Sequence, residues 1–366
     1  MDAERASLPS CPRSRQQGAS CLDRPTLPSL TGLRWVAALL VFGLHASLAQ
    51  YVGGTGGAVV SRVCAAGDTG VCFFFMLSGF VLTWSYHRGD GAVLFLWHRA
   101  ARIYPVYLTT TALAGVLAYT ITPYMKPHRT ALIADLLLAQ TWDPAWRKSL
   151  NPVSWSLACE AFFYCMFPLL IRLIQRFPAR MAGAACLAVI TIAACFSHGT
   201  TLGWTWDAYY NPLARLPEFI SGILLARLVA LNRQRGPSLP WVCPVTLLCY
   251  GGACMTGGAW HNTLMLPCFA FLIPAAAQAD INKNGSWWGR PVMVRLGKIS
   301  FCFYMIHLLM IRLVERIFDL YRPQLPSEQG TALVLGVFSA SLILAWLLHT
   351  GIEQPAQRFM LRLRHS

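Results

Sequence analysis

The sequence predicts an all-α fold, a polytopic membrane helical bundle of about ten transmembrane helices. Of its 366 residues, 55% are apolar and only 12% are charged, whereas a soluble domain carries roughly a quarter charged residues. Apolar tracts near the length of about 20 residues that a spanning helix needs recur along almost the whole chain. The tracts lie at residues 33–50, 69–86, 104–122, 153–174, 181–197, 213–231, 241–258, 263–279, 297–317 and 331–350.

These spans define one membrane domain, residues 28–356, with a short tail at each end. Residues 1–27 are polar, rich in Pro and Ser, and lack the apolar core of a signal peptide, so we expect a disordered cytoplasmic tail. Residues 357–366 form a short basic cytoplasmic tail. The apolar segment 131–140 is too short to span, which favours an interfacial or re-entrant position in the longest loop.

The net charge of +15 arises mainly from Lys and Arg in the short loops between apolar tracts. Nucleic-acid binding would need a basic patch on a folded soluble surface, which such loops do not provide. Membrane proteins retain basic residues in cytoplasmic loops, and placing both termini in the cytoplasm puts about twice as many of them inside as outside. We therefore expect an integral membrane protein surrounded by lipids, with both termini cytoplasmic and no nucleic-acid partner.

The 13 cysteines lie mostly within apolar tracts, without paired metal-ligand spacing. They are expected to be small core residues, with no metal site and no permanently bound cofactor. The chain also lacks a Walker loop, a dinucleotide fingerprint, a zincin helix and a nucleophile elbow, so a covalent serine mechanism has no support. Ser78 and Gly79 form a small polar notch in the second span, which favours close helix packing.

Ionisable side chains inside spanning helices are costly and usually functional. Arg34 and His45 are eleven residues apart on the first span, which places them within about 20° of one face and about 16 Å apart along the axis. An extended phosphopantetheine arm has a comparable reach, so Arg34 would hold the polar end of a thioester donor and His45 would be the general base. The alternative is an orientation anchor and a helix-packing histidine. The full set is Arg34, His45, Glu160, Arg215, Glu218, His307 and His349.

Glu160 reaches a depth similar to that of His45, about 21 and 18 Å from their cytoplasmic helix ends. A carboxylate on the second ring nitrogen would fix the tautomer and stabilise the imidazolium, so both residues are candidate catalytic groups. Alternatively, Glu160 forms a structural pair with an Arg. His307, about 15 Å into its span, is a candidate substrate-binding residue facing the same cavity. Its alternative role is a core histidine bonded to a carbonyl or Tyr.

Arg99 and Arg102 are three residues apart at the cytoplasmic entrance to the third span, on one helical face. Two guanidinium groups there form a clamp for the phosphates of a coenzyme arriving from the cytosol. With Arg34 they make up the candidate cofactor-binding set. The alternative is positive-inside anchoring beside Trp97 and Tyr104.

Several of these segments, in order along most of the chain, resemble the acyltransferase 3 family of membrane acyltransferases. The first span carries the family's Arg, ten residues, then His, and Arg99 with Arg102 match its Arg-x-x-Arg. The matching segments are LTGLRWVAALLVFGLHA, GVCFFFMLSGFVL, HRAARIYPVY, WSLACEAFFYCMFPLL, RLPEFISGILLARL, LGKISFCFYMIHLL and IEQPAQRF.

The resemblance implies ten core helices and acyl transfer from a cytoplasmic acyl-CoA, with acetyl-CoA the expected co-substrate, to a hydroxyl of a carbohydrate or glycosylated molecule. Thr31 and Ala161 depart from the family, where many members have acidic residues, and this leaves donor and acceptor details open. The resemblance supports functional roles for Arg34, His45, Arg99, Arg102 and Glu160. It places His307, Arg215, Glu218 and Glu353 in motif positions, as structural or site-shaping residues.

We therefore expect a membrane O-acyltransferase of the bacterial plasma membrane. Its acceptor would be a glycosylated small molecule such as a macrolide or an envelope polysaccharide, and the compact, Arg-rich build favours small-molecule tailoring. The alternative is a transporter or flippase for a glycosylated or lipid-linked substrate, but the internal repeats typical of transporters are not evident. An inactive receptor or scaffold is disfavoured because Arg34 and His45 are both retained.

Overall fold

The computed structural model describes residues 25–86, 91–120, 127–147, 149–199, 207–231, 236–319 and 322–363. Within these ranges the chain is helical, and its β structure is limited to one isolated bridge between Val52 and Leu325. The helices are α1 (Pro28–Leu48), α2 (Gly54–Val63), α3 (Thr69–Ser85), α4 (Ala92–Thr120), α5 (Arg129–Leu136), α6 (Trp155–Ile174), α7 (Ala179–Ser197), α8 (Pro212–Leu231), α9 (Leu239–Met255), α10 (Ala259–Ile281), α11 (Pro291–Ile317), α12 (Ser327–Leu348) and α13 (Gln354–Arg362).

The structure confirms the predicted all-α bundle, and each of the ten predicted spans coincides with a helix. Six helical segments are long and apolar enough to cross a membrane by length and composition, and α3 and α9 are shorter apolar helices. Leu187 of α7, Leu247 of α9 and Trp346 of α12 are each more than half exposed. Exposed apolar side chains of this size are suited to contact with lipid.

Helix α4 begins at Ala92, twelve residues before the predicted start of the third span. The added turns carry His98, Arg99 and Arg102, so a hydropathy pattern detects only the apolar remainder of the helix. Helix α5 overlaps the first part of the short segment predicted at 131–140. Helices α2 and α13 were not predicted, because each is too short to show as a spanning tract.

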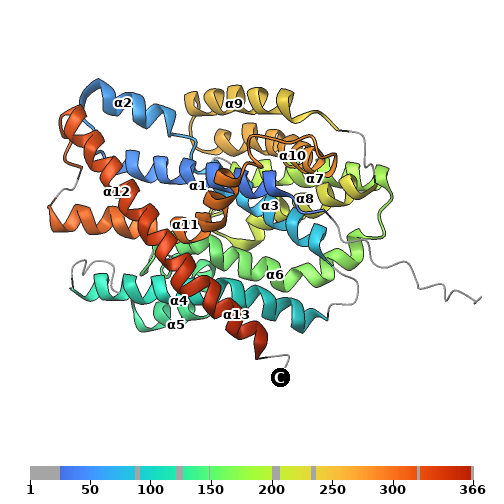
Figure 1. The fold of residues 1–366 in the computed structure, drawn as a ribbon, viewed down its shortest axis with the longest axis horizontal. Helices are drawn as coiled ribbons and strands as arrows, with labels where there is room; N and C mark the ends of the chain where they lie inside the picture. Colours follow the sequence, from blue (N-terminus) through green and yellow to red (C-terminus); the bar gives the residue numbers. More distant parts are fainter. Residues whose placement is uncertain are drawn as a thin grey trace, which may run out of the picture.

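Most helices lie side by side along the long direction of the molecule, whereas α12 crosses the face of the bundle obliquely (Figure 1). A π-helical turn at His349–Glu353 joins α12 to α13. The indole Nε1–H of Trp97 on α4 donates to the carbonyl oxygen of Met360 on α13 at 3.1 Å. The tail predicted at 357–366 is thus helical and docked on α4 as far as Arg362, while the predicted N-terminal tail lies almost wholly outside the described residues.

Glycines bring the helices that carry the site close together. A Cβ at Gly79 of α3 would collide with the carbonyl oxygen of Phe219 on α8, and one at Gly222 of α8 would collide with that of Met76. The predicted close packing at the Ser78–Gly79 notch is therefore confirmed. Helices α1 and α11 also approach closely, because Gly297 lies against the backbone of Thr31.

Candidate active site

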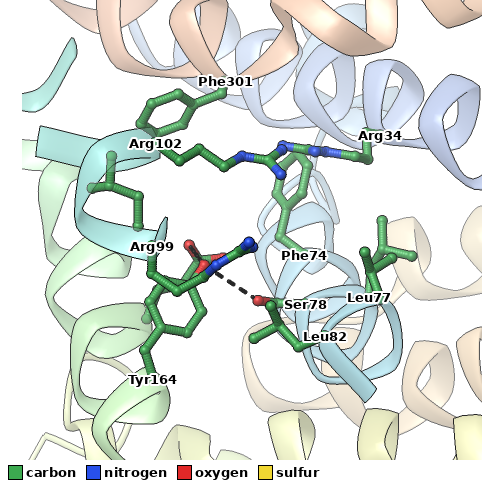
Figure 2. Close-up of a pocket in the computed structure, with 12 residues that line it drawn as sticks. Arg34, Phe74, Leu77, Ser78, Leu82, Arg99, Arg102, Tyr164 and Phe301 are labelled. Atoms are coloured by element: carbon green, nitrogen blue, oxygen red, sulfur yellow. Dashed lines mark hydrogen bonds between the residues drawn. The ribbon is translucent and has the colours of Figure 1, made fainter. Parts of the chain in front are cut away.

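A narrow polar cavity of about 70 Å³ opens between α1, α3, α4, α6 and α11. This arginine cavity is lined by three arginines and one glutamate, together with Ser78, Tyr164 and apolar side chains. Figure 2 shows Arg34 and Arg102 reaching toward each other from opposite sides, with Arg99 directed into the same space. The structure therefore brings together Arg34, Arg99, Arg102 and Glu160, four residues that the sequence predicted for the site.

The arginine cavity has an excess of positive charge. No oxygen of a described carboxylate lies within 4 Å of the guanidinium groups of Arg34, Arg99 or Arg102. The Nε of Arg99 is buried without a hydrogen-bond partner, and its guanidinium carbon lies 5.8 Å from the centre of the Phe95 ring. Three guanidinium groups facing one carboxylate in the interior of a helical bundle favour an anionic ligand, since buried charges need compensation.

Glu160 is held by a neighbour on its own helix. The hydroxyl of Tyr164, one turn later on α6, donates to Glu160 Oε2 at 2.8 Å. It also lies 3.5 Å from the hydroxyl of Ser78 (Figure 2). The charge of Glu160 interacts with those of the three cavity arginines. The structure therefore places Glu160 at the arginine end of the site, and it gives His45 a different hydrogen-bond partner.

His45 is hydrogen-bonded to His307, with 3.0 Å between His45 Nδ1 and His307 Nε2. His307 Nδ1 lies 2.7 Å from the carbonyl oxygen of Tyr304, which can only accept. Nδ1 of His307 therefore carries the proton, and its Nε2 in the neutral ring accepts from His45 Nδ1–H. The lone pair of His45 is then on Nε2, the nitrogen a general base would use. A second histidine thus occupies the position beside His45 that the sequence assigned to Glu160.

The arginine cavity and the histidine pair are connected along α11. A second small cavity of about 60 Å³ shares Arg34, Glu160 and Phe301 with the first and extends to Ser156 and Tyr304. The Tyr304 hydroxyl is 2.8 Å from that of Ser156, and its ring centre is 5.8 Å from that of His307. Since α1 runs unbroken from Pro28 to Leu48, the spacing of about 16 Å between Arg34 and His45 is retained.

Sequence reasoning missed Tyr164, Ser156 and Tyr304. Tyr164 and Ser156 each lie four residues from Glu160, so an i±4 search around that acid would have found both on its helical face. Tyr304 stands three residues before His307, also on one face. None of the three was predicted, because burying a Ser or Tyr hydroxyl in an apolar span costs much less free energy than burying a charge.

Another group of ionisable residues lies at the π-helical turn. The thiol of Cys302 donates to Glu353 Oε2 at 3.1 Å, and His349 Nδ1 lies 2.7 Å from the same oxygen. Within the described ranges, these three side chains form the one group with ligand atoms within 4.8 Å of one another that a metal could use. Gln354 completes the network by donating to His349 Nε2 at 2.8 Å. The cluster is therefore satisfied by its own hydrogen bonds.

Arg215 and Glu218 form a buried ion pair on α8, with 2.9 Å between Nη1 and Oε1. Arg215 Nη2 also donates to Cys72 Sγ at 3.3 Å. Neither residue is part of the lining of the arginine cavity. The pair fixes the start of α8 against α3, the helix that supplies Ser78.

Comparison with known proteins gives three informative relatives. The chain is 34% identical to the acyltransferase MdmB of Streptomyces mycarofaciens, over 92% of this chain and 93% of that protein. It is 25% identical to nodulation protein 10 of Rhizobium leguminosarum bv. viciae, over 66% of this chain and 71% of the relative. It is 26% identical to the O-acetyltransferase OatA of Staphylococcus aureus, over 55% of this chain and 34% of that longer protein. No solved structure matches the chain.

The fold and the site define a class of protein. It is an all-α integral membrane protein with a cationic cavity and a buried histidine pair. Residues 27–350 match the acyltransferase domain of the acyltransferase 3 family, and the chain belongs to this family. It is therefore an enzyme that transfers acyl groups, and the transporter alternative is set aside.

Proposed function

We propose that the enzyme transfers a short acyl group, acetyl in the first instance, from acyl-CoA to a hydroxyl of a sugar or glycosylated small molecule. The observation that supports an acyl-CoA donor is the set of three guanidinium groups without a carboxylate within 4 Å in the described chain. Arginine binds phosphate through paired, charge-assisted hydrogen bonds, and coenzyme A carries several phosphate groups.

In the proposed reaction, Arg34, Arg99 and Arg102 hold the phosphates while the thioester reaches toward His45. His45 Nε2 accepts the proton of the acceptor hydroxyl as its oxygen attacks the thioester carbonyl carbon. The C–S bond breaks, and the leaving thiolate takes the proton from the imidazolium to give free CoA. His307 keeps Nε2 of His45 unprotonated before the attack by accepting from Nδ1–H. Glu160 orients the arginines through their charges.

The acceptor is proposed from the relatives and from the build of the chain. The Staphylococcus aureus relative is named an O-acetyltransferase, which supports a hydroxyl acceptor. The alignment with the acyltransferase MdmB of Streptomyces mycarofaciens covers 92% of this chain and 93% of that protein. The short loops and the Arg-rich composition of the membrane domain favour a diffusible glycosylated molecule over an envelope polysaccharide. We further propose that the enzyme resides in a bacterial plasma membrane with both termini cytoplasmic.

The test is transfer of radiolabel from acetyl-CoA to extracted cellular glycosides by membranes that contain the wild type or His45→Ala at matched expression. General bases contribute roughly 10²–10⁴ in rate, so label is expected to fall by that factor. His128→Ala, at an exposed position on the described chain, is the matched control and should transfer normally. Equal label with His45→Ala would remove His45 as the base, and absence of transfer with every short acyl-CoA would contradict the proposed donor.

A further inference from the structure

A third cavity, of about 290 Å³, lies at the opposite end of the bundle from the arginine cavity. This outer cavity is formed where α3, α8 and α10 begin and α7 ends. Its volume is near the lower end of the roughly 300–1,000 Å³ typical of small-molecule pockets, which suits one sugar ring and not a whole natural product. Its lining among the described residues includes Asp68, Asp207, Tyr209, Arg215 and Asn262.

The charges around the outer cavity are paired, unlike those of the arginine cavity. Asp68 is 3.1 Å from His261 Nδ1, and Asp207 forms a salt bridge with Arg147. Arg215 is paired with Glu218. A site whose carboxylates each have a basic partner offers no net attraction for a phosphate or a free ion. It favours a neutral ligand with many hydroxyl groups, which hydrogen-bond to carboxylates and guanidinium groups without changing their charge balance.

Two side chains provide the remaining elements of sugar recognition. Tyr209 is one of the lining residues, and a tyrosine side chain combines an apolar ring with a polar hydroxyl at its edge. Asn262 Oδ1 accepts from the thiol of Cys72 at 2.7 Å. Its amide nitrogen makes no hydrogen bond to the described chain and is left to donate to a ligand hydroxyl.

The outer cavity is close to the reaction path in two respects. Gly67, just before Asp68, packs against Leu40 and Leu44 of α1, so the cavity begins at the depth of the residues that precede His45. Arg215 lies between the outer cavity and the second small cavity. Its guanidinium carbon is 5.2 Å from the Tyr209 ring centre and 5.3 Å from that of Phe75. Phe75 and Tyr304 both line the second small cavity, the one of about 60 Å³ beside the arginine cavity. One layer of side chains thus separates the two cavities.

We propose that the outer cavity binds a neutral pyranose ring of the acceptor, so that the acceptor enters from the face opposite the arginine cavity. This inference rests on the proposed function and names the part of the acceptor that is recognised. Donor and acceptor then approach from opposite ends of the bundle and meet near His45. The arginine cavity has unpaired cations, which suit an anionic donor. The outer cavity has paired charges, which suit a neutral polyol.

The test is saturation-transfer NMR on the full-length protein in lipid nanodiscs, with methyl glucoside, methyl rhamnoside and a methyl 2,6-dideoxyhexoside as probes and glycerol as a nonspecific polyol. Ala259 lines the outer cavity and is only partly buried, so Ala259→Trp fills the cavity without disturbing the core. Leu264→Trp, on the exposed side of the same helix, is the matched control. Binding of acetyl-CoA is measured on each sample.

We expect at least one glycoside to bind the wild type, His45→Ala and Leu264→Trp, and to bind Ala259→Trp at least tenfold more weakly with acetyl-CoA binding unchanged. Arg102→Ala should give the reverse, with weaker acetyl-CoA binding and normal glycoside binding. Absence of glycoside binding above glycerol, or equal binding to Ala259→Trp, would overturn the inference. Failure of the proposed function would instead show as unchanged transfer by His45→Ala, so the two are distinguishable.

Discussion

At the scale of single residues, the contact between His45 and His307 determines which ring nitrogen is free for chemistry. The carbonyl of Tyr304 fixes the proton on His307 Nδ1, and the remaining lone pair fixes the proton on His45 Nδ1. The orienting group is therefore a neutral imidazole where the sequence suggested a carboxylate. A neutral partner holds the tautomer but compensates less of the positive charge that develops on the base.

His307→Phe should lower kcat roughly 10- to 100-fold, less than loss of the base itself, because only the tautomer and orientation of His45 are lost. The KM for acetyl-CoA should stay near the wild-type value, since the arginine cavity is untouched. Steady-state kinetics with the pH dependence of kcat provides the measurement. A purely structural role would instead lower folded yield and leave the kcat of the folded fraction unchanged.

Arg99→Ala and Arg102→Ala should each raise the KM for acetyl-CoA roughly tenfold, the effect of about 1.4 kcal/mol of lost binding energy. The sharper comparison uses S-acetyl-pantetheine, which has the thioester arm without phosphates. Wild type and variants should then have similar KM values. Arg62→Ala, an exposed position on α2, is the control. An equal rise in KM for the truncated donor would show that these arginines do not bind phosphate.

At the scale of elements, two helix contacts show how the facing surfaces determine the packing. Helix α3 approaches α8 through Gly79 and Gly222, which places Ser78 at the arginine cavity. Helix α5 docks on α4 through the Tyr107 hydroxyl, which donates to the carbonyl oxygen of Asp135. The first contact is apolar and close, while the second is polar and buried.

Gly79→Ala should destabilise the protein by about 1–3 kcal/mol, since the added methyl group meets the Phe219 backbone and not a movable side chain. Gly183→Ala on α7 is the matched control, because its Cβ would have nothing within 4 Å. There the change should be neutral or stabilising by up to about 1 kcal/mol, from the higher helix propensity of Ala. Thermal unfolding in detergent compares the two, and equal midpoints would contradict close packing at Gly79.

Asp135 makes the docking of α5 sensitive to pH. Burial raises the pKa of its carboxyl to about 7, against a smaller opposing effect of the hydrogen bond from Ser149. The folded-state pKa lies above the unfolded value of 3.8, so the folded protein binds this proton more tightly than the unfolded chain does. The contribution of the protonated carboxyl to the free energy of unfolding is therefore present at low pH and is lost as the pH rises through about 7. Asp135→Asn keeps an acceptor for Ser149 and cannot ionise.

The melting temperature of the wild type relative to Asp135→Asn should therefore fall between pH 5 and 8, in scanning fluorimetry with one detergent throughout. Other titrating groups cancel in this difference, because both proteins contain them. A difference that is constant across this range would show that the Asp135 carboxyl keeps an ordinary pKa.

At the scale of the whole molecule, the arrangement places the arginine cavity and the outer cavity at opposite ends of one bundle. Helices α1 and α11 run in the same direction, since Thr31 meets Gly297 and His45 meets His307. An orientation with the termini in the cytoplasm gives the arginine cavity access to acyl-CoA, which is made there.

Reporter fusions test that orientation. A fluorescent protein fused after Ser366 should fluoresce, and alkaline phosphatase at the same place should be inactive. Fusions after Arg322, between α11 and α12, should give the opposite pattern. An active phosphatase at the C-terminus would place the arginine cavity on the outer face and exclude cytosolic acyl-CoA as its ligand.

The membrane bundle, its ten helical segments and the four charged residues of the arginine cavity could be predicted from the amino-acid sequence. Apolar tracts of spanning length have few folded solutions, because every backbone polar group must be satisfied within the helix. Arg34, Arg99 and Arg102 stood out since guanidinium groups in or beside apolar helices are rare and costly. The spacing of Arg34 and His45 followed from the geometry of a single helix.

Which side chains meet across helices could not be predicted from the sequence, because it depends on how the helices pack. It paired His45 with His307, 262 positions away, and Glu160 with Tyr164 beside the arginines. Helical periodicity and depth made Glu160 and His307 equally plausible partners for the ring of His45. These two quantities specify the depth and the helical face of a residue, but not the rotation of one helix against another. That rotation is set by packing, at glycines such as Gly297 and Gly79, whose role depends on the backbone that faces them.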